Sequence, residues 1–161
     1  MSNNRKILSV SYSEEQLLIR TIAADLLLSG FNANNTIVVT VSTDYSSIIG
    51  QVLRHLLSKD GEVCDGFGVD VPYPDEHWNE DYIYNLEIVV AINQPNMSFK
   101  KVLLVEAGVI RGGNYTFIER FFKGRGITDI YTVAMFENIH STYKSTYVGE
   151  YYDNDTQDLT F

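Results

Sequence analysis

The sequence has few of the residues that build disulfide-linked or metal-rich proteins, and it has no long apolar segment. Its 161 residues include one cysteine, Cys64, which excludes an internal disulfide and a cysteine-rich metal site. No apolar run reaches the ~18 residues that a membrane-spanning helix needs, and the polar start MSNNRK is unlike a secretory signal. These absences predict a protein of the reducing cytoplasm that does not insert into a membrane.

Basic residues are also scarce. Twelve lysines and arginines stand against 21 acidic residues, for a formal net charge of −9. A nucleic-acid partner is therefore not expected, because neutralising a phosphate backbone requires a basic surface. One small phosphate pocket is still compatible with this charge. The histidines His55, His77 and His140 show no pair at ligand spacing, so no metal site is predicted.

What is present is the alternation of an α/β protein. Hydrophobic residues make up 45% and charged residues 20% of the chain, which predicts a single globular domain over residues 1–161. Strand–helix repeats predict a mostly parallel sheet flanked by helices. Strands are expected at Lys6–Val10, Thr36–Val41, Glu62–Val71, Leu86–Ile92, Val102–Glu106 and Asp129–Phe136. Helices are expected from a Ser13/Gln16 capping box to Leu28, at Ser46–Ser58 and at Tyr115–Lys123.

The segment Lys101–Thr116 is the most informative part of the chain. A buried strand ends at Glu106, a turn carries Arg111-Gly112-Gly113-Asn114, and a helix pattern follows. Free N–H groups and the positive end of a helix dipole bind anions, and glycines allow close approach of a phosphate. An ordinary strand-to-helix turn is the alternative, because short glycine motifs often match by chance.

These residues resemble the signature of type I phosphoribosyltransferases, which is a hydrophobic strand, two acidic residues, an apolar spacer and a Thr-Gly-Gly-Thr-like loop. Glu106 takes the first acidic place and Ala107 the second, and the spacer includes Gly108 and Val109. The resemblance implies that Glu106 binds the ribose hydroxyls of phosphoribosyl pyrophosphate (PRPP). It implies that the loop binds the 5′-phosphate, through Arg111, Gly112, Gly113 and Asn114.

The resemblance covers roughly residues 11–155 and points to the purine enzymes that act on hypoxanthine, guanine or xanthine. Ser42, Thr43 and Asp44 fall where that family keeps its pyrophosphate loop, and residues 71–92 fall where it has a small hood over the site. The tail Tyr143–Asp155 is similar to the family pattern Lys-Pro-Asp-Tyr/Phe-Val-Gly. By position, Tyr147 would stack on the base and the backbone of Val148 would read its edge.

Four positions depart from the family pattern. Ala107 removes half of the acidic pair, and Ile110 stands where purine enzymes often place an aspartate near the base. Glu137 falls at or near the position of a lysine that reads the purine oxygen. Asp44 would cap a helix, but it would also repel a pyrophosphate. The residues kept, Glu106 and the Arg111–Asn114 loop, suit a nucleoside monophosphate.

Three functions stay open at this point. The first is an active purine-type phosphoribosyltransferase that uses Mg²⁺ and PRPP. The second is a catalytically inactive regulator that binds a purine nucleotide, and the third is a subunit-interaction protein that keeps only the fold. The tyrosine-rich tail at residues 143–152 fits base stacking or pairing between subunits, so a homodimer is one expectation. Catalytic residues are not assigned.

Overall fold

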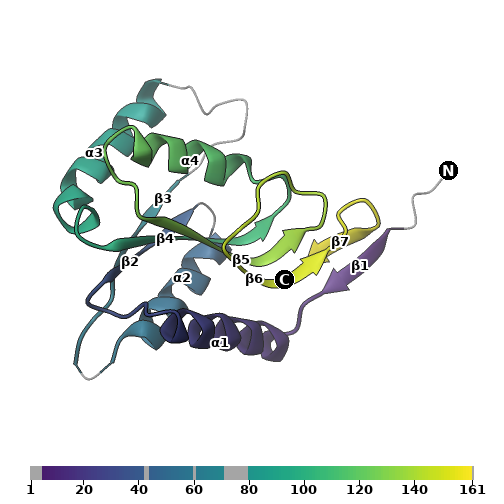
Figure 1. Cartoon of the computed structure of the whole chain (residues 1–161). Helices are drawn as coiled ribbons and strands as arrows, with labels where there is room; N and C mark the ends of the chain where they lie inside the picture. Colours follow the sequence, from purple (N-terminus) through teal and green to yellow (C-terminus); the bar gives the residue numbers. More distant parts are fainter. Residues whose placement is uncertain (1–4, 42–43, 60, 71–79, 161) are drawn as a thin grey trace.

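The computed structural model describes residues 5–41, 44–59, 61–70 and 80–160. Its centre is a five-stranded sheet in the order β3-β2-β4-β5-β6, and all the neighbouring strands run parallel (Figure 1). The strands are β2 (Thr36–Val41), β3 (Asp65–Val69), β4 (Lys101–Val109), β5 (Ile130–Asn138) and β6 (Tyr147–Tyr152). The prediction of a mostly parallel α/β sheet is confirmed.

Helices cover both faces of the sheet, as parallel crossovers require. On one face, α1 (Tyr12–Leu28) and α2 (Asp44–Leu57) form a core with the sheet that includes Ile22, Leu53 and Val105. On the other face, α3 (Glu80–Met97) and α4 (Gly113–Lys123) form a second core that includes Val90 and Phe122. Figure 1 shows the two layers of helices on opposite sides of the strands.

A second, two-stranded sheet joins the two ends of the chain. β1 (Lys6–Ser9) pairs in parallel with β7 (Gln157–Thr160), and Figure 1 shows this pair beside the main sheet. Arg5 reinforces it: its Nη2 donates to the carbonyls of Asn154 and Gln157, the latter at 2.7 Å. The same nitrogen lies 3.0 Å from a carboxylate oxygen of Asp158.

The prediction of a strand at Leu86–Ile92 is wrong, because these residues form the middle of α3. Leu86 and Val90 are buried, one helical turn apart, whereas Ile88 and Ile92 are 41% and 73% exposed. A short apolar run rich in β-branched residues fits a buried strand and a half-buried helix equally well. The hood expected at residues 71–92 lies partly outside the described residues, and its described part belongs to α3.

Other boundaries shift by a few residues. The capping box of α1 uses Ser11 and Glu14, where Ser13 and Gln16 were expected. β4 continues to Val109, so the predicted spacer residues Gly108 and Val109 belong to the strand. Cys64 is fully buried.

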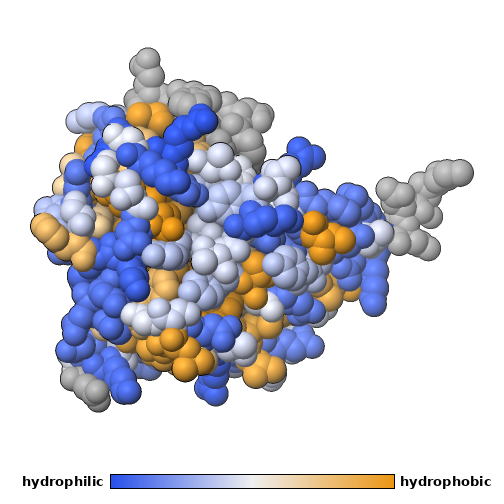
Figure 2. All heavy atoms as spheres, in the orientation of Figure 1, coloured by the Kyte–Doolittle hydropathy of each residue, from blue (hydrophilic) through white to orange (hydrophobic). Residues whose placement is uncertain are grey.

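The surface is mainly polar, with separate apolar groups (Figure 2). One group lies along the lower edge of Figure 2, where Figure 1 has α1, a helix that exposes Leu17 and Leu28 at 66% and 87%. None of the described helices combines the length and the hydropathy that a membrane-spanning segment needs.

Candidate functional site

The predicted loop lies where the crossovers of the sheet change direction. The connection from β2 through α2 leads to β3 on one side, and the connection from β4 through α4 leads to β5 on the other. In open parallel sheets this divergence leaves a crevice outside the carboxyl ends of the strands, and ligands bind there. Thr40 pairs with Val105, so β2 ends beside Glu106 while β4 runs on to Val109.

A cleft of about 530 Å³ opens at this point. This volume lies within the range of small-molecule sites, which is roughly 300–1,000 Å³. All five residues predicted to bind ribose or phosphate contribute to its wall. The described lining residues are Glu106, Gly108, Val109, Ile110, Arg111, Gly112, Gly113 and Asn114.

Gly112 sets the shape of the loop. It precedes α4 with φ of 81°, a left-handed conformation that side chains with a Cβ rarely adopt. A Cβ at this position would lie 2.1 Å from the Cβ of Tyr143, so the backbone packs directly against that residue. Gly113 begins α4, and a Cβ there would meet nothing within 4 Å. The two glycines of the motif therefore have different roles.

Glu106 and Asn114 form the polar pair of the cleft. Asn114 Nδ2 donates to Glu106 Oε1 at 2.9 Å. Burial raises the pKa of the Glu106 carboxyl to about 7, and the hydrogen bond from Asn114 opposes that effect only in part. The N-cap of α4 is Gly112, and no side chain caps the helix. The first N–H groups of α4 consequently have no partner within the helix.

Arg111 supplies the positive charge of the loop. Arg111 is exposed and lines the cleft. No carboxylate of the described residues lies within ion-pair distance of its guanidinium. Its carbonyl accepts a hydrogen bond of 3.3 Å from Thr142 Oγ1. An unpaired guanidinium next to free helix N–H groups has the donor pattern that phosphate oxygens accept.

Asn138, at the end of β5, holds this loop and was not found by sequence reasoning. Its Nδ2 donates to the carbonyl of Ile110 at 3.0 Å. Its Oδ1 accepts from the backbone N–H groups of His140 at 3.3 Å and Asn154 at 3.1 Å. One amide therefore connects the loop at Ile110 to two further loops. A pattern of local residues cannot reveal such a contact, because Asn138 and Ile110 lie 28 positions apart.

Solved structures with a similar fold include purine phosphoribosyltransferases. The purine phosphoribosyltransferase of Pyrococcus horikoshii matches with a TM-score of 0.68 at 12% identity, over 96% of this chain and 92% of that one. The hypoxanthine phosphoribosyltransferase of Staphylococcus aureus matches with 0.64 at 12%, over 94% and 80%. The xanthine-guanine-hypoxanthine enzyme of Helicobacter pylori matches with 0.55 at 12%, over 94% and 90%.

The chain has a phosphoribosyltransferase-type fold. The match covers nearly the whole chain, so the resemblance read from the loop is confirmed at the level of the fold. No protein-family model matches the chain, and no curated protein matches its sequence. At these identities the phosphoribosyltransferase-type fold is what the comparisons establish, and the chemistry has to be argued from the residues in the cleft.

Within the phosphoribosyltransferase-type fold, Ala107 is a core residue. It is 4% exposed and packs in the core on the α1 and α2 face, whereas Glu106 lines the cleft. Its backbone N–H donates at 3.0 Å to the hydroxyl of the buried Ser46, in the first turn of α2. This bond fixes the start of α2 against β4, so position 107 positions the site without lining it.

Glu137 is fully buried near the end of β5. One carboxylate oxygen accepts from the Ser145 N–H at 2.9 Å, and the other has no hydrogen-bond partner among the described residues. The side chain does not belong to the described wall of the cleft. Glu137 therefore anchors the loop between β5 and β6 in this structure.

The residues predicted for the base, Tyr147 and Val148, are not part of the described wall of the cleft. Ser42 and Thr43 lie outside the described residues, and Asp44 is the first residue of α2. Tyr147 packs against Phe31 with ring centroids 5.9 Å apart, in the core on the α1 side. Val148 pairs with Ala134, which pairs with Glu106, so it lies two strands away from Glu106.

A Mg²⁺ ion held by the protein alone does not fit this cleft. Mg²⁺ takes oxygen ligands and is usually bound by one or two carboxylates together with substrate phosphates. Glu106 is the one carboxylate of the described wall, and it already accepts a hydrogen bond from Asn114. Any Mg²⁺ at this site would therefore be carried mainly by the phosphates of a ligand.

Proposed function

We propose that the protein binds a purine nucleotide or PRPP through the 106–114 loop, with the 5′-phosphate at Arg111, Gly112, Gly113 and Asn114. The observation that carries this proposal is the unpaired Arg111 guanidinium beside the free N–H groups of α4, at the mouth of a cleft of about 530 Å³. The ribose hydroxyls would donate to Glu106, which lines the same cleft.

Purine is favoured as the base because the similar solved structures are purine enzymes by their descriptions. The stacking partner is not assigned, because Tyr147 packs in the core on the α1 side. If the protein is an enzyme, the activity that we propose is the transfer of a phosphoribosyl group from PRPP to a purine base. The Mg²⁺ ion would then be carried by the pyrophosphate.

A catalytically inactive nucleotide-binding regulator is the second candidate, and two observations favour it. The second acidic place of the motif is Ala107, whose side chain packs in the core. Glu137, near the place of the lysine that reads the purine oxygen, is buried and bonded to Ser145. Both changes remove groups that the resembling enzymes use to bind the ribose and the purine base, and they leave residues 111–114 in place. A subunit-interaction protein that keeps only the fold would lack nucleotide binding altogether.

The test is a thermal-shift and calorimetric titration with purine monophosphates, ribose 5-phosphate and PRPP, each with and without Mg²⁺. A ligand that binds only the folded protein raises the midpoint as RT ln(1 + [L]/Kd). A shift with Mg²⁺-PRPP supports the transferase and justifies a turnover assay. A shift with monophosphates alone supports the regulator, and no shift with any ligand rejects the proposal.

Arg111→Ala and Arg120→Ala form a matched pair for this titration. Both side chains are exposed arginines, but Arg120 lies in the last turn of α4, away from the helix N-terminus. Loss of a charge-assisted contact to phosphate in Arg111→Ala is expected to weaken binding about tenfold or more, since such bonds contribute roughly 1.5–3 kcal/mol. Equal affinities for the two variants would remove Arg111 from the site.

A cytoplasmic location and a homodimer stay predictions. Light scattering on the purified protein measures the oligomeric state directly. The prediction of the location rests on the single cysteine, and fractionation of expressing cells tests it.

A further inference from the structure

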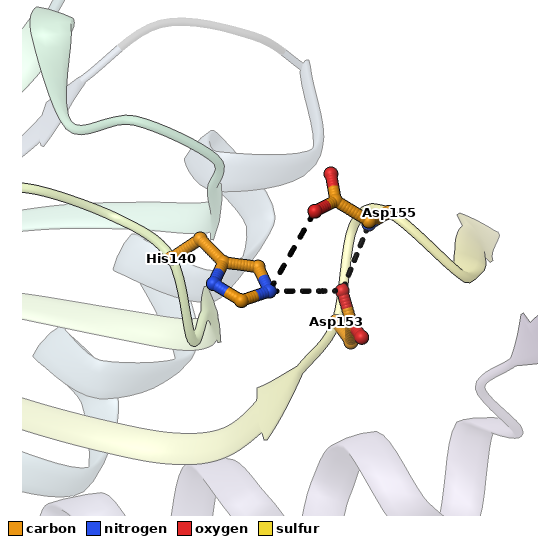
Figure 3. Close-up of side chains that lie close together, drawn as sticks. All are labelled: His140, Asp153 and Asp155. Carbon is orange, nitrogen blue, oxygen red and sulfur yellow. Dashed lines mark hydrogen bonds and ion pairs between the residues drawn. The ribbon is translucent and has the colours of Figure 1, made fainter.

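A second cluster of polar side chains lies outside the cleft, on the loops beyond β5 and β6. His140 follows β5, and Asp153 and Asp155 lie in the turn between β6 and β7 (Figure 3). His140 Nε2 is 3.4 Å from Asp153 Oδ1 and 3.7 Å from Asp155 Oδ2. Figure 3 shows the imidazole and both carboxylates turned toward one another from two separate loops.

These separations match the edges of a metal coordination shell. In a tetrahedral zinc site, ligand atoms at 2.0–2.2 Å from the ion lie about 3.4 Å from one another. The three ligand atoms of the cluster all lie within 4.8 Å of one another. An ion could therefore contact all three with small side-chain rotations.

The charges of the cluster also favour a cation. Two carboxylates face one imidazole. The N–H of Asp155 donates to Asp153 Oδ1 at 2.9 Å and holds that carboxylate close to Asp155. A neutral imidazole and two ionised carboxylates are the protonation states that bind a metal.

We propose that His140, Asp153 and Asp155 bind one divalent transition-metal ion, of the Zn²⁺ type, at the protein surface. The imidazole distinguishes this donor set from a purely acidic cluster, because imidazole suits zinc, copper and nickel whereas Mg²⁺ and Ca²⁺ prefer oxygen ligands alone. Water or an external ligand completes the shell, since all three side chains are partly exposed.

Asn138 prepares the cluster by holding both loops. Its Oδ1 accepts from the N–H of His140, a ligand, and from the N–H of Asn154, which lies between the two aspartates. The two loops that carry the ligands are thus held relative to one another before an ion binds, which lowers the ordering cost of binding. The single histidine, without a histidine partner at ligand spacing, explains why the sequence predicted no metal site.

Isothermal titration of the metal-free protein with zinc chloride tests the proposal, with magnesium chloride as the comparison ion. One Zn²⁺ per chain is expected, with no saturable binding of Mg²⁺ over the same concentrations. His140→Ala and Asp155→Asn are each expected to weaken Zn²⁺ binding at least tenfold. His55→Ala is the matched control, because His55 is exposed on α2 away from the cluster, and it should bind as the wild type does.

Two results would overturn the site. One is the absence of Zn²⁺ binding, which would leave the cluster as an ion pair between two loops. The other is wild-type affinity in both His140→Ala and Asp155→Asn. Melting curves without metal show whether each variant is folded. Should a variant fail to fold, the imidazole NMR signals of the wild type decide, because Zn²⁺ must shift those of His140 and leave those of His55 unchanged.

Discussion

Glu106 belongs to the candidate site and also affects the stability of the fold. Its carboxyl has a pKa of about 7, raised from 4.5 by burial. The folded protein therefore keeps a proton between pH 4.5 and 7 that the unfolded chain has released. This contribution to the free energy of unfolding is fully present below pH 4.5 and is lost as the pH rises through 7.

Glu106→Gln is expected to remove this pH dependence. The variant should be more stable than the wild type above pH 7, by an amount of order 3 kcal/mol, and the difference should vanish near pH 4.5. Urea unfolding of both proteins from pH 4.5 to pH 8.5 measures the difference. Parallel curves over this range would contradict the burial of the Glu106 carboxyl.

Gly112 and Gly113 offer a second test at the same scale. Gly112→Ala places a Cβ at φ of 81° and against the Cβ of Tyr143. The left-handed conformation alone costs about 1–2 kcal/mol, and the clash adds to it, so a loss of at least roughly 2 kcal/mol is expected. Gly113→Ala adds a Cβ in open space at the start of α4 and should leave the stability unchanged or raise it slightly. Equal urea midpoints for the two variants would show that the loop has another conformation.

At the scale of the elements, Asn138 is expected to control the order of the phosphate loop. Asn138→Asp keeps an acceptor for the N–H groups of His140 and Asn154, but it turns a carboxylate toward the carbonyl of Ile110. Losing a donor to a partly buried carbonyl costs about 1–3 kcal/mol. Faster amide hydrogen exchange is therefore expected at residues 110–114.

The control for this change is Asn93→Asp. Asn93 Nδ2 also donates to a carbonyl, that of Val89, at 2.8 Å, but within α3. This variant should leave the exchange of residues 110–114 as it is in the wild type. If both variants accelerate the loop equally, the effect is a general loss of stability and not the loss of the bond to Ile110.

Sequence reasoning reached the elements that carry a strong local pattern. The β-branched run Thr36–Val41 forms β2 as predicted, and β4 leads through a glycine turn into α4 as predicted, although α4 already begins at Gly113. The prediction failed where one pattern fits both a strand and a helix. In α3, the buried residues Leu86 and Val90 lie one helical turn apart. Sequence reasoning also could not find Asn138, whose partners are brought near by the fold alone.

At the scale of the whole molecule, strands near the two ends of the chain pair with each other. β1 and β7 pair over four residues each, outside the main sheet. A two-stranded sheet is marginally stable on its own, so this pair should be the first part of the described structure to open. Arg5 opposes that opening by binding the carbonyls of Asn154 and Gln157 and the carboxylate of Asp158.

Arg5→Ala is therefore expected to destabilise the pairing of β1 with β7 without destabilising the central sheet. Removing the charge-assisted bonds should cost the pair roughly 2 kcal/mol, which corresponds to about thirtyfold faster exchange of the amides of β1 and β7. The amides of β2 and β4 should keep their protection, because different parts of a fold open with different free energies. Native-state hydrogen exchange of the metal-free protein measures both regions in one experiment. A uniform loss of protection would mean that the ends of the chain and the central sheet unfold together, and Arg5 would then be part of the global stability of the fold.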